Sequence, residues 1–248
     1  MDKIGLPEQG KITVEQYEME EAEYRKWKEL FYSEPAHFFH EVRKREDKEL
    51  ALLYLYVSFA AELHEDYVKR KISDEIYFDT FSDISIWDKS CLRIKRLPGL
   101  IEEEWLARHL NMRLFRLGRL QYEIEGDVLH IHIPEGGPLL EEECDRSLKK
   151  AEQFFGGKYR IYDCESWLLD PALNKLLGPG SNIIKFQKRF QIDKVIYEIP
   201  QAEERIFGSV LERKEDYPEG TALQRKMKQY LLSGGKIGLG YGVLIRRP

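Results

Sequence analysis

Cysteine is scarce in this chain, which has three in 248 residues. Cys91, Cys144 and Cys164 are far apart and form neither a CxxC pair nor a Cys/His pattern with the spacing of metal ligands. The sequence therefore predicts neither a disulfide framework nor a structural zinc site. Because such cysteine usage suits a reducing compartment, we expect a cytoplasmic protein.

Long hydrophobic runs are missing as well. The longest apolar stretch, residues 51–61, contains two tyrosines and is too short to span a bilayer, so it predicts a buried helix and no membrane partner. The opening residues MDKIGLPEQG have an early acid and no apolar core, a composition that excludes a secretory signal.

The chain also lacks an excess of positive charge. Its formal net charge is −5, and its Lys/Arg-rich pieces, such as 69–71 and 225–228, are more simply explained as solvated helix faces. Because phosphate backbones attract clustered Lys and Arg, this argues against a nucleic-acid partner. With 42% hydrophobic and 33% charged residues, the composition is typical of a globular protein with a substantial core.

Helical periodicity dominates roughly the first 110 residues. We expect helices at 14–31, 50–64 and 101–110, and a fourth through 76–87 that is opened by Ser73 as its N-cap. The 50–64 helix is apolar around most of its circumference, so it should lie in the centre of this region. The sequence thus predicts a helical N-terminal domain over residues 1–111.

From Leu114 onward the helical period gives way to alternation of apolar and polar residues. Two alternating runs are joined by Glu125-Gly126-Asp127 as a hairpin. The elements expected after it are a helix at 139–155, a strand at 159–167, a short helix at 171–177, a strand pair at 182–192 and 194–199 turned by Asp193, a helix from the Thr221/Gln224 capping box to Ser233, and a last strand at 236–245. They predict a second domain over 112–248 and an α+β fold class.

The segment between the strand at 128–134 and the helix at 139–155 contains the glycine loop Glu135-Gly136-Gly137-Pro138. A strand that leads into a glycine loop at a helix N-terminus places backbone amide donors beside a sheet edge, an arrangement that binds phosphate-bearing cofactors. Adjacent glycines before a helix are also ordinary turn chemistry. A ligand-handling enzyme is therefore one of two interpretations.

The element order from Leu114 resembles that of acyl-CoA-dependent N-acyltransferases of the GNAT type. Four segments, LFRLGRLQYE, HIPEGGPL, C-x-S-W-L-L-D-P and SNIIKFQKRF, together with the earlier IYFDTFSDISIW, are similar to a bacterial family of acyltransferase-domain proteins. Its members have a helical N-terminal part and a GNAT-like C-terminal part with a mixed, mostly antiparallel sheet. The resemblance implies acyl-CoA or acetyl-CoA as co-substrate and a small-molecule amine as acceptor; it leaves the oligomeric state open, a homodimer included.

The resemblance also implies where the donor would bind. Acyl-CoA would lie along the strand that ends with Ile133 and Pro134, and its pyrophosphate would meet the amides of Glu135, Gly136 and Gly137.

Acyl transfer needs a base for the amine and donors for the carbonyl and the leaving thiolate. The candidate bases are Glu135, His132 and Glu165. The candidate donors are Cys164, Ser166 and Tyr162.

Two departures favour an alternative function. The pyrophosphate signature Gln/Arg-x-x-Gly-x-Gly/Ala is replaced by Pro134 to Pro138, where Pro138 lacks an amide donor, and three glutamates at 141–143 repel a polyanion. Glu165 also stands where members of the family often carry a histidine. The alternative is a catalytically inactive GNAT-like module that binds ligands or regulates, and a third hypothesis is a cysteine hydrolase that uses Cys164 with a histidine.

Two further motifs have simpler explanations. Gly235 to Gly240 imitates a phosphate loop, but no helix follows it and its alternating glycines favour close backbone packing. His130 and His132 share one strand face, where a sheet environment explains them without a metal. We therefore predict no metal site.

Overall fold

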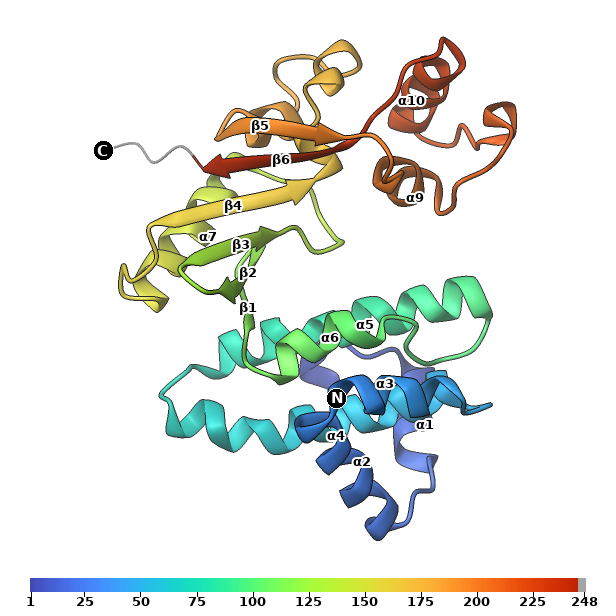
Figure 1. Ribbon diagram of the computed structural model, residues 1–248, viewed down its shortest axis with the longest axis vertical. Coiled ribbons are helices and arrows are strands. Elements are labelled where there is room, and N and C mark those ends of the chain that lie inside the picture. Colours follow the sequence, from blue (N-terminus) through green and yellow to red (C-terminus); the bar gives the residue numbers. More distant parts are fainter. Residues whose placement is uncertain (245–248) are drawn as a thin grey trace. The chain divides into compact units, whose positions relative to one another are not determined.

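The computed structural model describes residues 1–244. The chain divides into two compact units, Met1–Glu123 and Ile124 onward. Helices fill the first unit, and most of a mixed sheet belongs to the second (Figure 1). The predicted α+β class is therefore confirmed. The domain boundary between residues 111 and 112 stays a prediction. The predicted end of the second domain, Pro248, lies outside the described residues, and so does Ile245, the last residue of the last expected strand.

The first unit has more helices than the sequence predicted. They are η1 (Asp2–Ile4), α1 (Glu8–Gln16), α2 (Glu21–Ser33), α3 (Pro35–Arg43), α4 (Lys48–Lys69), α5 (Asp74–Lys95) and α6 (Glu103–Leu110). The single helix expected at 14–31 is wrong, because the chain breaks into α1 and α2 there. Ser73 caps α5 as predicted, accepting a hydrogen bond from the Ile76 amide.

Helix α4 lies in the core of the first unit. Its Leu52, Leu53 and Leu55 side chains are buried, as the apolar circumference of the sequence indicated. Within the described residues no helix combines the length and the apolarity needed to cross a membrane.

Six strands form the sheet, in the order β1-β2-β3-β4-β6-β5. They are β1 (Leu114–Leu117), β2 (Leu120–Glu125), β3 (Val128–His132), β4 (Ile161–Ser166), β5 (Phe190–Ile196) and β6 (Leu239–Leu244). Strand β3 pairs in parallel with β4, whereas β1 with β2, β4 with β6, and β5 with β6 are antiparallel. The last strand thus lies between two earlier ones.

Helices and 3-10 turns connect the strands of the second unit. They are α7 (Glu141–Phe154), η2 (Trp167–Leu169), η3 (Pro171–Lys175), α8 (Asn182–Gln187), α9 (Gln201–Phe207), η4 (Lys214–Asp216) and α10 (Ala222–Leu232). The predicted capping box is present, with Thr221 and Gln224 each bonding the other's backbone.

The strand expected at 182–192 is wrong. Residues Asn182–Gln187 form helix α8, and β5 starts only at Phe190. The Gln187 side chain holds this helix in place by donating to the carbonyls of Leu168 and Asp170, at 3.2 and 2.8 Å. Asp193 is not a hairpin turn either, because the register of β5 against β6 shifts between Ile192 and Lys194 and β5 continues past it.

The alternating glycines of β6 pack closely against other backbone, as the sequence predicted. A Cβ atom added to Gly240 would lie 2.7 Å from the carbonyl carbon of Leu169, and one added to Gly242 would lie 2.9 Å from the carbonyl oxygen of Gln191. Side chains at these positions would therefore clash, and the imitation of a phosphate loop has a packing origin.

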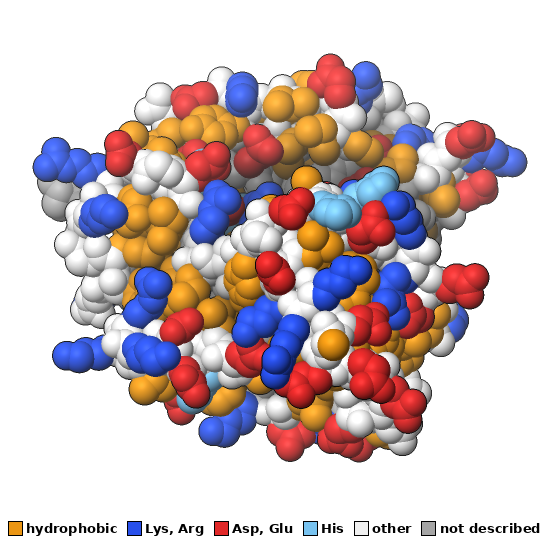
Figure 2. All heavy atoms as spheres, turned by 60° about the horizontal axis from the view of Figure 1, so that its bottom comes forward, with side chains coloured by type: hydrophobic (Ala, Val, Ile, Leu, Met, Phe, Trp, Pro, Cys, Tyr) orange, Lys and Arg blue, Asp and Glu red, His pale blue; other side chains and the backbone are white. Residues whose placement is uncertain are grey.

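Charged side chains of both signs are interspersed on the molecular face seen in Figure 2. This distribution is typical of solvated helix surfaces.

Candidate functional site

The parallel pair β3 and β4 is registered over only part of its length. The pairs run from Val128 opposite Ile161 to Ile131 opposite Cys164. Strand β4 continues along β6 as far as Ser166, which lies opposite Gly240. One partner strand therefore leads away into a loop while the other stays in the sheet.

The glycine loop follows immediately. Pro134 is buried, whereas residues 135–138 are exposed. Gly136 has a φ of 129°, a conformation that disfavours any side chain, and a Cβ at Gly136 or Gly137 would meet no heavy atom within 4 Å. Helix α7 begins three residues after Pro138, and its N-cap residue, Leu140, supplies no side-chain cap. A side chain at either glycine would thus point into open space.

Alternation along β4 places the predicted site residues on two faces of the sheet. Cys164 and Ser166 share a face with Tyr162, which lines a cavity beside α7. Glu165 is exposed and points to the opposite face. His132 follows His130 at the same alternation on β3, so it lies on the face of Glu165. The structure thus separates two of the candidate bases, His132 and Glu165, from the candidate donors of β4, while Glu135 lies in the loop after β3.

Cys164 is placed where it cannot act as an exposed nucleophile. Its side chain is 1% exposed, and burial raises the pKa of its thiol well above the usual range, an effect to which Asp163 and Glu165 add. The hypothesis of a cysteine hydrolase required an exposed thiol and is wrong. Ser166 is similarly buried and uses its hydroxyl to accept a hydrogen bond from the Leu168 amide at 3.2 Å.

A network of polar side chains crosses the face that carries Glu165. Asp163 accepts a hydrogen bond from the Tyr241 hydroxyl at 3.1 Å, and its other oxygen contacts Nδ1 of His130. Nε2 of His130 lies 3.1 Å from a carboxylate oxygen of Glu125. Burial, together with the neighbouring Asp163 carboxylate, raises the pKa of Tyr241. Four strands, β2, β3, β4 and β6, therefore contribute to one hydrogen-bonded row.

Sequence reasoning missed this row. It considered His130 only as a metal ligand and did not consider Asp163 or Tyr241. In residues 1–244 no group of three or more His, Cys, Asp or Glu is arranged to hold a metal ion. A usable signal would have been the parallel register, since His130 lies directly opposite Asp163 although the two residues are 33 positions apart.

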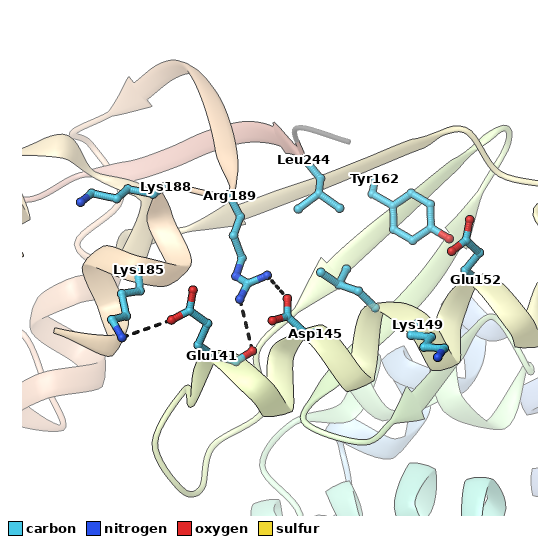
Figure 3. A pocket seen from close by; sticks show the side chains of 10 residues that line it. Glu141, Asp145, Lys149, Glu152, Tyr162, Lys185, Lys188, Arg189 and Leu244 are labelled. Carbon is cyan, nitrogen blue, oxygen red and sulfur yellow. Dashed lines mark hydrogen bonds and ion pairs between the residues drawn. The ribbon is translucent and has the colours of Figure 1, made fainter. Parts of the chain in front are cut away.

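A cavity of about 560 Å³ lies beside helix α7 (Figure 3). Tyr162 and Leu244 reach into it from the sheet, and charged residues of α7 and α8 surround it. Its lining consists of Glu141, Asp145, Leu148, Lys149, Glu152, Tyr162, Lys185, Lys188, Arg189 and Leu244. None of the predicted site residues except Tyr162 is among them.

Two ion pairs join α7 to the α8 side of this cavity. Lys185 lies 3.1 Å from Glu141, and Arg189 pairs with Asp145 while also donating to the Glu141 carbonyl at 3.2 Å (Figure 3). Within the described part of the chain, Lys149 and Lys188 form no ion pair. Of the described lining residues, Lys149, Lys188 and the anion Glu152 thus remain outside ion pairs in the lining, which carries four cations and three anions.

The motif C-x-S-W-L-L-D-P shapes the backbone that follows β4. Ser166 caps η2, Asp170 caps η3 by accepting from the Ala172 amide at 2.7 Å, and the Trp167 amide donates to the Gln201 side chain at 2.9 Å. Most of the motif is therefore explained by local structure.

Comparison with known structures shows the same fold in acyltransferases. The chain superimposes with a TM-score of 0.81 and 21% identity on an acyltransferase in complex with decanoyl-CoA and teicoplanin, covering 98% of this chain and 85% of that one. An acyltransferase mutant in complex with octanoyl-CoA gives a TM-score of 0.82 at 21% identity, over 99% of this chain and 86% of that one. No protein with a curated description matches.

Family models cover nearly the whole chain. Residues 1–112 match the N-acyltransferase N-terminal domain, and residues 114–244 match the GNAT-like C-terminal domain. The helical N-terminal and GNAT-like C-terminal parts that the sequence motifs indicated are thereby confirmed. The chain belongs to the family of acyltransferases that carry a GNAT-like C-terminal domain.

Proposed function

We propose that this protein transfers an acyl group from acyl-CoA to the amine of a small-molecule acceptor. The observation that carries the proposal is the end of the β3–β4 register at Ile131 and Cys164, directly before an exposed glycine loop and the start of α7. The family assignment and the acyl-CoA bound to the structural neighbours support the same function.

The donor would approach from the α7 side. Its pyrophosphate would meet the backbone amides of residues 135–137, and its nucleotide end would enter the cavity beside α7, where Lys149 and Lys188 offer positive charge. The acids of the first turn of α7 oppose this binding. Because Lys185 already neutralises Glu141, the repulsion comes mainly from Glu142 and Glu143.

The acceptor would approach from the face of Glu165 and His132. Glu165 is exposed and forms no ion pair within residues 1–244, so its carboxylate is a suitable base for an ammonium group that must lose a proton before attack. Glu135 lies in the exposed loop and is a second candidate base.

A donor series tests the proposal. Purified protein would be mixed with acetyl-, octanoyl- and decanoyl-CoA and with a panel of amines that includes amino sugars, amino acids and teicoplanin, and released thiol would be followed. The longer donors come first because the structural neighbours bind octanoyl-CoA and decanoyl-CoA.

We expect acceptor-dependent thiol release with at least one donor. If calorimetry shows that CoA binds but no thiol is released in the presence of any acceptor, the inactive ligand-binding module is favoured instead. Absence of both binding and release would contradict the transferase. The free, buried cysteines are consistent with the expected cytoplasmic location of such an enzyme.

A further inference from the structure

We infer that Tyr241 is a catalytic residue of this transferase, which relays the proton of the attacking amine to Asp163, and that His130 positions Asp163 for this task. The inference rests on the proposed function. It concerns a row of side chains that the sequence motifs do not include.

The position of Tyr241 in the sheet supports the catalytic role. Tyr241 lies opposite Glu165 in the register of β4 and β6, one position past the last registered pair of β3 and β4, Ile131 and Cys164. Residues opposite each other on antiparallel strands point to the same face. Tyr241 and Glu165 therefore stand side by side at the place where the two parallel strands separate.

The hydrogen bond that Tyr241 makes leaves it able to accept a proton. Its hydroxyl donates to Asp163 at 3.1 Å, so the lone pairs of the phenol oxygen remain to accept from a substrate N–H. The Asp163 side chain is 5% exposed, and such a buried carboxylate is costly unless it is well paired. His130 pairs with its second oxygen and so leaves the first for Tyr241.

The proton balance of the step is simple. When the amine nitrogen bonds to the thioester carbon and the C–S bond breaks, the nitrogen gives one proton to the Tyr241 oxygen. The proton of Tyr241 moves at the same time to Asp163, which later loses it to solvent. The CoA thiolate takes one proton from solvent, so no oxidant or further reactant is needed.

Charges on every neighbouring strand face Tyr241. Asp163 and Glu165 come from β4, Asp193 from β5, and His130 acts from β3 through Asp163. Lys194 of β5 lies 5.2 Å from the centre of the Tyr241 ring. Burial, and after it these anions, raise the pKa of the phenol, so Tyr241 remains protonated and able to relay at neutral pH.

Steady-state kinetics tests the catalytic role, with decanoyl-CoA as the donor and the most active amine of the panel as the acceptor. Tyr241→Phe removes only the hydroxyl, and its matched control is Tyr197→Phe, which alters a tyrosine that is 50% exposed. We expect Tyr241→Phe to lower kcat about a hundredfold, the scale of general acid–base catalysis, with an unchanged KM for decanoyl-CoA. Tyr197→Phe should match the wild type.

Variants of the other two residues test positioning. Asp163→Asn should lower kcat to a similar extent, whereas Asp193→Asn, which removes a nearby charge without touching the row, should not. His130→Ala should lower kcat at least tenfold, and His130→Asn, whose amide can still donate to Asp163, should restore part of it. Thermal unfolding of each variant reports whether it is folded.

The outcomes separate this inference from the proposed function. An inactive wild type overturns both. An active wild type with an equally active Tyr241→Phe overturns the relay alone. A loss in Tyr241→Phe that comes with an equal rise in KM for decanoyl-CoA or with a lower folded fraction also overturns it, because a structural role then explains the loss.

Discussion

Asp170 accepts a hydrogen bond from the backbone amide of Gly238 at 2.7 Å, although the two residues are 68 positions apart. Its other carboxylate oxygen accepts from the Ala172 amide, also at 2.7 Å. The side chain is thus shared between the turn after β4 and the segment that enters β6. The aspartate of the C-x-S-W-L-L-D-P motif therefore fixes the sheet beside the proposed site.

Replacing Asp170 by alanine should destabilise the second unit. The change leaves the buried Gly238 amide and the partly buried Ala172 amide without their acceptor, which costs about 3 kcal/mol of unfolding free energy. Urea denaturation followed by circular dichroism measures it. Asp216→Ala, which removes an exposed carboxylate 3.7 Å from Arg213, serves as control and should change stability by less than about 0.5 kcal/mol. Equal effects of the two changes would contradict the bracing role.

Gly240 should not tolerate a side chain. A Cβ there would lie 2.7 Å from the backbone of Leu169, so Gly240→Ala should cost about 1–3 kcal/mol through overpacking. Gly180→Ala is the matched control, because a Cβ at Gly180 meets nothing within 4 Å and its φ is not in the left-handed region. Comparison of the two melting temperatures checks this expectation, and a stable Gly240→Ala protein would mean that β6 can move away from Leu169.

Local patterns in the sequence predicted several elements well. The Thr221/Gln224 box and the Ser73 cap depend on residues that are close along the chain, and both form as expected. The glycine alternation of β6 was equally legible, because small residues at every second position leave room only for backbone.

Prediction from the sequence failed where tertiary contacts determine the secondary structure or the pairing of strands. Residues 182–187 read as strand because a short apolar run fits either period, yet Gln187 anchors them as a helix. The row of Asp163, His130 and Tyr241 depends on a parallel register and on the insertion of β6 beside β4. Neither arrangement is encoded by spacing along the chain, so the role of these three residues could not be predicted from the sequence.

The three cysteines should be unreactive in the folded protein. All are buried, and burial raises the pKa of Cys91 to about 11 and that of Cys164 still further. Since the thiolate is the reactive species, labelling by a maleimide at pH 7 should be far slower than that of a free thiol. A Ser233→Cys variant, exposed at the end of α10, should label quickly. Rapid labelling of the wild type would revive a role for Cys164.

Asp88 should make the first unit less stable as pH rises. One of its oxygens accepts from the Gly99 amide at 2.8 Å, the other has no hydrogen-bond partner, and burial raises its pKa. A folded-state pKa above the unfolded value of about 3.9 means that the folded state binds the proton more tightly. The contribution of Asp88 to stability is therefore complete below that value and is lost as pH rises through the folded-state pKa.

Asp88→Asn should consequently be more stable than the wild type at pH 7, because it avoids a buried charge and keeps an acceptor for Gly99. The difference should vanish below about pH 4, where the wild-type carboxyl is protonated. Thermal unfolding at both pH values measures it, with Asp127→Asn as an exposed control. A variant that is less stable at pH 7 would show that the unpartnered oxygen of Asp88 meets water.

Lys188 should contribute to CoA affinity through the phosphate on the ribose of the nucleotide. It lines the cavity beside α7 and forms no ion pair within residues 1–244, so its charge is available to a ligand. We expect Lys188→Ala to weaken CoA binding by about 1 kcal/mol, roughly fivefold. The same substitution should weaken the binding of dephospho-CoA, which lacks that phosphate, much less.

Lys226→Ala on the exposed side of α10 carries the same change of net charge and is the control. Calorimetry at low and high salt makes the comparison, because a charge contact at the surface should weaken with added salt. Equal losses for CoA and dephospho-CoA would place the nucleotide end outside this cavity.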